Sequence, residues 1–66
     1  PDIAAVQRAL AAYGYEIEAT GKMDARTKAV VAAFQRHFRP RRVDGEIDQE
    51  TAGLAQALTP ASRRLT

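Results

Sequence analysis

A seven-residue motif occurs twice in this chain of 66 residues. The first copy reads GKMDART from residue 21 and the second reads GEIDQET from residue 45, so the copies are 24 positions apart (45 − 21 = 24). Each copy holds a glycine that permits a tight turn, an apolar residue, and an aspartate that can cap a helix. Two copies of one turn-and-helix unit in a short chain indicate a small helical domain built by duplication.

Four residues of the motif have predicted structural roles. Gly21 and Gly45 are expected in turns, because glycine adopts positive φ without steric cost. Asp24 and Asp48 are expected to cap the helices that follow, by accepting hydrogen bonds from backbone amides that have no partner within the helix. The match between the copies continues into those helices, where Val30, Val31 and Phe34 correspond to Leu54, Ala55 and Leu58.

The spacing of apolar residues predicts the first two helices. One follows Asp2, carries the apolar stripe Ile3, Val6, Leu10 and Tyr13, and ends at Gly14. The alternating segment 15–18 is then expected to be extended, with Tyr15 and Ile17 facing the core. The second helix buries Thr27, Val30, Val31, Phe34 and Phe38, and must stop by Arg39, because Pro40 disfavours helical geometry in the residue before it.

The third helix is expected to follow Asp48, to bury Thr51, Leu54, Ala55 and Leu58, and to end at Thr59-Pro60. The sequence therefore predicts an all-α fold, a small three-helix bundle with an internal duplicated turn-cap-helix unit. We expect one domain over residues 1–58 and a flexible C-terminal tail over residues 59–66, which lack apolar periodicity. Since the chain has no cysteine, helix packing and capping must supply its stability.

Arginines are concentrated in one segment. The net charge is only +2, but Arg36, Arg39, Arg41 and Arg42 fall within seven positions. Such a cluster favours an acidic partner, such as a carboxylate-bearing polymer, nucleic acid or an anionic membrane. The alternative is a solvated helix end, where positive charge complements the helix dipole.

Catalysis is the least expected function. His37 is the single histidine, whereas a zinc site commonly needs three protein ligands. Glu46 and Glu50 flank Asp48, whose expected capping role excludes an acid/base pair there. No apolar run approaches the ~20 residues of a membrane span and no signal peptide is present. Because the chain begins at Pro1, we expect a fragment or a processed product.

Several motifs together resemble the peptidoglycan-binding domain family, over about residues 3–58. They are Val6-Gln7 with Leu10, Tyr13-Gly14-Tyr15, the two Gly/Asp/Thr units, and Ala29-Val30 running into Phe34-Gln35. Members of that family are three-helix modules made from a duplicated helix unit. The segment 34–40, followed by Asp44-Gly45-Glu46 and Asp48, is similar to the C-terminal module of bacterial N-acetylmuramoyl-L-alanine amidases.

The chain departs from the common family pattern at three places. Thr20 precedes the first glycine where the family has aspartate. Met23-Asp24 and Ile47-Asp48 stand where the family often has phenylalanine then glycine. These changes keep an apolar residue at the base of the core and strengthen the helix cap.

The resemblance implies a non-catalytic module that holds a linked zinc amidase domain on peptidoglycan, exported to the periplasm or cell envelope of a bacterium. The module itself would need no cofactor and no metal, and would be a monomer that neither inserts into membranes nor binds nucleic acid. Stem peptides carry carboxylates, which guanidinium groups grip through paired hydrogen bonds. The ligand surface is therefore expected to include Arg36, Arg39, Arg41 and Arg42, together with Tyr15 as a sugar-stacking group.

Two other functions remain open at this point. Three helices and a basic loop can dock on nucleic acid. The fold can also serve as a structural or protein-docking domain without affinity for the wall, since folds are reused for unrelated tasks.

Overall fold

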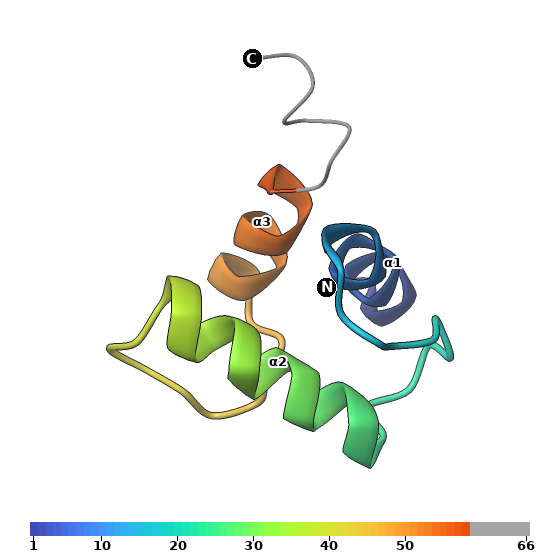
Figure 1. Ribbon diagram of the computed structural model, residues 1–66, viewed down its shortest axis with the longest axis horizontal. Coiled ribbons are helices and arrows are strands. Elements are labelled where there is room, and N and C mark those ends of the chain that lie inside the picture. The colour runs from blue at the N-terminus through green and yellow to red at the C-terminus, as the bar shows by residue number, and fades with distance from the viewer. Residues whose placement is uncertain (59–66) are drawn as a thin grey trace.

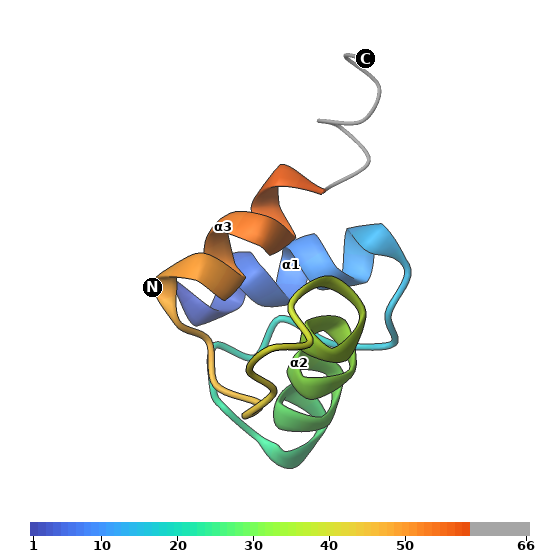
Figure 2. The same ribbon diagram turned by 90° about the vertical axis from the view of Figure 1, so that its left-hand side faces the viewer.

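The computed structural model describes residues 1–58, which form three α-helices and no β-strand: α1 (Ile3–Tyr13), α2 (Ala25–Phe38) and α3 (Gln49–Ala57). The expected all-α, three-helix architecture is confirmed. Helices α1 and α3 lie against each other, and α2 crosses beneath them (Figures 1 and 2). The flexible tail expected over residues 59–66 lies outside the described residues.

Each helix begins at the expected aspartate. The carboxylates accept backbone hydrogen bonds three residues on, which supplies partners to amides that the helix leaves unpaired. The three bonds run from Ala5 to Asp2 (3.1 Å), from Thr27 to Asp24 (2.9 Å) and from Thr51 to Asp48 (2.8 Å). The predicted caps of the duplicated unit are therefore confirmed.

The helices end close to the expected positions. Gly14 has φ 134° and its amide donates to the carbonyls of Leu10 and Ala11, which closes α1. Helix α2 stops at Phe38, before Arg39 and Pro40. Helix α3 stops at Ala57, slightly before the Thr59-Pro60 end that the sequence predicts.

The core is small and rich in alanine. Its buried apolar residues come from all three helices: Val6, Ala9, Leu10, Val30, Val31, Phe34, Ala52 and Ala55. Tyr15 and Ile17 pack against this cluster from the first loop, as expected, and Ile47 does so from the second. Phe38, Leu54 and Leu58 are only partly buried, so fewer apolar side chains are buried than the spacing of apolar residues in the sequence predicts.

A buried glutamine organises the first loop. Gln7 is fully buried in α1, and its side-chain carbonyl accepts a hydrogen bond from the backbone amide of Gly21 (2.8 Å). Its amide nitrogen donates to the hydroxyls of Thr27 (2.8 Å) and Thr20 (3.0 Å) and to the carbonyl of Lys22 (3.1 Å). Gln7 thereby joins α1 to the turn and to the first turn of α2.

A second buried glutamine repeats this arrangement 28 positions later (35 − 7 = 28). The side-chain carbonyl of Gln35 accepts from the amides of Asp44 (3.0 Å) and Gly45 (2.9 Å). Its amide nitrogen donates to the carbonyl of Glu46 (2.9 Å), the hydroxyl of Thr51 (3.1 Å) and Asp44 Oδ1 (3.1 Å). The duplication therefore includes the end of the preceding helix as well as the turn and the helix that follows.

Replacing either buried glutamine with alanine should strongly destabilise the domain. Gln7→Ala removes four hydrogen bonds and Gln35→Ala removes five, at about 0.5–1.5 kcal/mol for each bond. We expect Gln7→Ala and Gln35→Ala each to lower the free energy of unfolding by about 3 kcal/mol or more, as measured by urea denaturation. Gln56→Ala is the matched control, because Gln56 is exposed on α3 and should change stability by no more than about 0.5 kcal/mol. Equal losses for the three variants would contradict this role.

The two turn glycines should differ in their tolerance of alanine. Both have positive φ, 76° at Gly21 and 73° at Gly45, so alanine is strained by about 1–2 kcal/mol at either position. A Cβ at Gly45 would also lie 3.2 Å from the carbonyl oxygen of Lys28, whereas a Cβ at Gly21 meets open space. Gly45→Ala should therefore cost more stability than Gly21→Ala in thermal melts. A larger loss for Gly21→Ala would show that the close approach to Lys28 is unimportant.

Candidate binding surface

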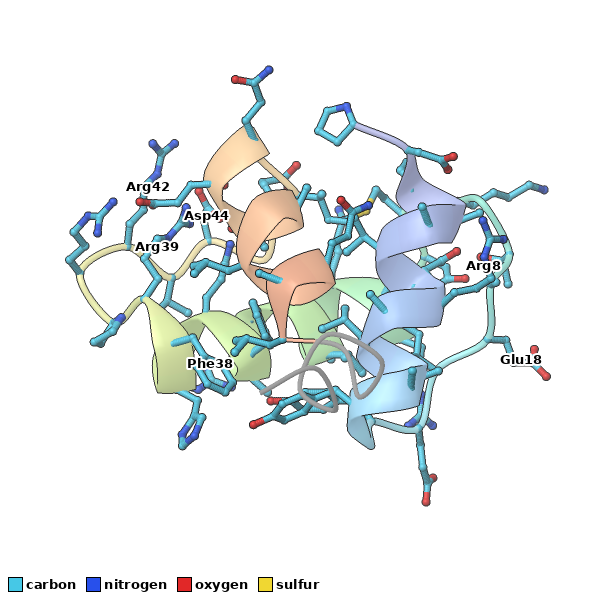
Figure 3. All side chains as sticks on the ribbon, turned by 90° about the horizontal axis from the view of Figure 1, so that it is seen from above. Arg8, Glu18, Phe38, Arg39, Arg42 and Asp44 are labelled. Carbon is cyan, nitrogen blue, oxygen red and sulfur yellow. The ribbon has the colours of Figure 1, made fainter. Side chains whose placement is uncertain are left out.

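The arginine segment lies at the end of α2 and in the loop that follows it. In Figure 3, Arg39, Arg42 and Asp44 gather on one side of the molecule, while Arg8 and Glu18 lie on the opposite side. The four arginines expected to bind a ligand are not equivalent in this structure. One of them is buried and three are exposed.

Arg39 is the buried member, with only 4% of its surface exposed. Its guanidinium donates to both carboxylate oxygens of Asp48 (2.8 and 2.7 Å), to Glu50 (3.1 Å) and to the backbone carbonyl of Arg42 (3.0 and 3.2 Å). From the sequence we expect Arg39 to belong to the ligand surface, but in the structure its donors already have partners within the domain. Arg39 instead fastens the second loop to the start of α3.

The other three arginines reach solvent. The side chains of Arg41 and Arg42 are 71% and 70% exposed, and they pair with Glu50 and Asp44 respectively. Arg36 is exposed on α2 and has no ion pair with any residue in the range 1–58. Exposed ion pairs contribute little to stability, so the guanidinium groups of Arg41 and Arg42 are held only weakly by their partners.

The acidic residues beside the arginines are held in their charged forms. The pKa of Asp48 lies far below its usual range, because the carboxylate accepts hydrogen bonds from the Thr51 amide and then from Arg39. Arg41 and then Arg39 lower the pKa of Glu50. The pKa of Asp44 is lowered mainly by the amide of Glu46 and further by Gln35 and Arg42. The surface is therefore a set of alternating charges rather than a purely basic patch.

Tyr15 lies in an aromatic cluster and is half-buried. Its ring stacks against Tyr13 with centroids 6.1 Å apart and meets the edge of Phe34 at 6.4 Å. Burial raises the pKa of its hydroxyl, and the neighbouring Tyr13 raises it further. Because the ring already packs on other rings, only its outer face and hydroxyl are left for a sugar.

His37 is exposed and packs against the edge of Phe38, with ring centroids 4.3 Å apart. In the range 1–58 there is no group of three or more histidine, cysteine, aspartate or glutamate residues that could hold a metal ion. None of the three helices in this range is long and apolar enough to cross a bilayer.

The structural roles of Gln7, Gln35 and Arg39 were not predicted from the sequence. One signal for the glutamines was present, since Gln7 lies three residues before the apolar Leu10 of α1 just as Gln35 lies three residues before Phe38 of α2. Val6-Gln7 and Leu10 recur as Phe34-Gln35 and Phe38 at a spacing of 28. For Arg39, the sequence has four acidic residues within the next eleven positions, but which arginine turns inward depends on the path of the loop.

The fold and the exposed charged groups define a small helical module built from a duplicated unit, with an arginine-bordered surface. The chain belongs to the peptidoglycan binding domain family, whose model matches residues 1–54. It is similar to a segment of N-acetylmuramoyl-L-alanine amidase AmiD from Escherichia coli (strain K12), at 40% identity over 57 residues. The match covers 86% of this chain and 20% of the amidase. A comparison with solved structures gives no significant match.

The buried arginine should couple stability to pH. Folding lowers the pKa of both Asp48 and Glu50, so the stability that these carboxylates contribute is complete above the ordinary pKa of such groups and is lost as the pH falls through their lowered folded-state pKa values. We expect Arg39→Gln to lower the melting temperature at pH 7 and to flatten its fall between about pH 5 and pH 2. Arg36→Gln is the control, since an exposed change should stay within about 0.5 kcal/mol. Identical pH profiles for the two variants would refute the role of Arg39.

Proposed function

We propose that this chain is a peptidoglycan-binding module that holds an attached wall hydrolase, an N-acetylmuramoyl-L-alanine amidase, on its insoluble substrate. The observation that carries the proposal is the family match over residues 1–54, together with the 40% identity to a segment of an amidase. The module would lie in the periplasm or cell envelope, joined to a catalytic domain that supplies any zinc. Within this assembly the module would be a monomer without a cofactor.

Tethering explains why a weak site is sufficient for such a role. A module that stays on the polymer raises the effective concentration of the linked catalytic domain near its substrate, without adding any contact to the reaction. Exposed guanidinium groups suit this task, because each can hold a carboxylate of a stem peptide through two parallel hydrogen bonds. We assign this role to Arg36, Arg41 and Arg42, with Tyr15 offering its outer face to a sugar.

The charges on this surface argue against nucleic acid as the partner. Arg41 and Arg42 stand beside Glu50 and Asp44, whose carboxylates would repel a phosphate backbone. A continuous basic surface would be needed for the strong, salt-dependent binding that duplex DNA requires.

Sedimentation with purified insoluble peptidoglycan tests the proposal. The wild-type module should pellet with the polymer, and the triple variant Arg36→Gln, Arg41→Gln, Arg42→Gln should bind at least about tenfold more weakly, because charge-assisted hydrogen bonds to carboxylates are lost. The matched control removes the same three charges elsewhere, through Arg8→Gln, Lys22→Gln and Lys28→Gln, and should pellet like the wild type.

The possible outcomes separate the site from the function. If the triple variant pellets as well as the wild type, the arginine surface is not the binding site. If the folded wild-type module stays in the supernatant, the wall-binding function is wrong and a docking role without wall affinity is favoured. Retention on duplex DNA with a steep salt dependence would instead support a nucleic-acid-binding domain.

A further inference from the structure

An open pocket of about 400 Å³ lies between the first loop and the start of α2. It is lined by Glu16, Ile17, Glu18, Thr20, Asp24 and Arg26. Glu16, Glu18 and Arg26 are exposed and make no ion pair with any other residue of the range 1–58. The pocket therefore presents acidic and basic side chains that form no ion pair within the described part of the chain. Glu18 of the pocket lies on the side of the molecule opposite to Arg39 and Arg42 (Figure 3).

The duplication gives this pocket a counterpart that is already filled. In the second copy, the guanidinium of Arg39 lies between the loop and the start of α3, where it contacts the carbonyl of Arg42 and the carboxylates of Asp48 and Glu50, and lies 3.9 Å from Asp44. Moving these four positions back by the repeat spacing of 24 gives four residues of the open pocket. They are Glu18, Thr20, Asp24 and Arg26.

The first copy has no arginine to fill its pocket. In the register set by Gln7 and Gln35, 28 positions apart, the counterpart of Arg39 is Ala11. Ala11 is exposed and ends at its methyl group, so the position of α1 that corresponds to Arg39 carries no guanidinium. The first copy thus shares the turn glycine and the capping aspartate with the second copy. Among residues 1–58, it has no buried arginine side chain between its loop and the following helix.

The charges of the first pocket define what could replace that cation. Glu16 and Glu18 extend from the loop beside the carboxylate of Asp24, which favours a positively charged group. Arg26 stands where the second copy has Glu50, so one wall of the first pocket is positive. A ligand that satisfies both walls needs a cation and an anion close together.

We propose that this pocket binds the zwitterionic end of an amino acid, with its ammonium group toward Glu16, Glu18 and Asp24 and its carboxylate toward Arg26. The volume lies within the range of small-molecule sites. The inference rests on the proposed function for its biological ligand, because wall peptides carry amino-acid groups of this kind. It gives the module a second contact with the wall peptide, separate from the arginine surface.

Titration by NMR with three matched probes tests the pocket. Diaminopimelate carries an ammonium and a carboxylate at each end, 1,5-diaminopentane keeps only the cations, and pimelate keeps only the anions. Diaminopimelate should shift the backbone amides of residues 16–26, with saturation in the millimolar range or below. The diamine should shift the same amides at least about twofold more weakly, since it lacks the contact with Arg26, and pimelate should leave them unchanged. Unmoved amides over residues 16–26 with diaminopimelate would overturn the proposal, as would shifts spread evenly over the domain.

Two exposed variants locate the contacts without disturbing the fold. Glu18→Gln and Arg26→Gln should each weaken diaminopimelate by about two- to fivefold, as expected for exposed charge pairs. Lys28→Gln is the control, because Lys28 is an exposed residue of α2 that does not line the pocket, and its affinity should equal that of the wild type. Affinities unchanged in both pocket variants would overturn the proposal.

The failure of this inference can be told apart from failure of the proposed function. If the wild type pellets with peptidoglycan but diaminopimelate moves no amide of residues 16–26, the pocket proposal is wrong and wall binding stands. If diaminopimelate occupies the pocket but the wild type does not pellet, the wall-binding function is wrong and the pocket remains an amino-acid site.

Discussion

The side-chain amides of Gln7 and Gln35 hold this domain together at the two places where its helices change direction. Each amide uses both its carbonyl and its nitrogen within the interior, and every partner comes from the following loop or the first turn of the next helix. The apolar core is small and largely alanine, so it supplies little area to fix the angle between helices. The two glutamines supply that constraint with directional bonds instead, and no buried side-chain polar atom in the range 1–58 is left without a partner.

The sequence predicted the parts of this fold that depend on local chemistry. Helix starts at Asp2, Asp24 and Asp48 follow from interactions that span three residues, and Gly14 closes α1 through its own φ. The inward turn of Arg39 could not be predicted in this way, because its partners Asp48 and Glu50 lie nine and eleven residues further along the chain. In a one-dimensional charge pattern, Arg39 is indistinguishable from exposed neighbours such as Arg41.

The two copies of the duplicated unit share their turn and cap residues but differ in the charged side chains around the loop. Both copies keep the glutamine, the turn glycine, the capping aspartate and the threonine of the following helix. Only the second copy adds a buried guanidinium at the loop. There the glutamine lies four positions closer to the turn, since Gln7 precedes Thr20 by 13 positions and Gln35 precedes Asp44 by 9. The second unit therefore satisfies its acidic groups internally, whereas the first leaves its charged groups to solvent.

The division between internal and exposed charges determines which contacts a ligand can take over. A carboxylate that approached Arg39 would have to displace Asp48 and Glu50 from a buried guanidinium, which is unfavourable because Arg39 is 4% exposed and those contacts are made within the domain. A carboxylate that approaches Arg41 or Arg42 displaces only an exposed ion pair, at a cost of about 0–1 kcal/mol. An exchange of partners at Arg41 and Arg42 would therefore leave the hydrogen bonds of Gln7, Gln35 and Arg39 intact, because none of those bonds is made by an exposed arginine side chain.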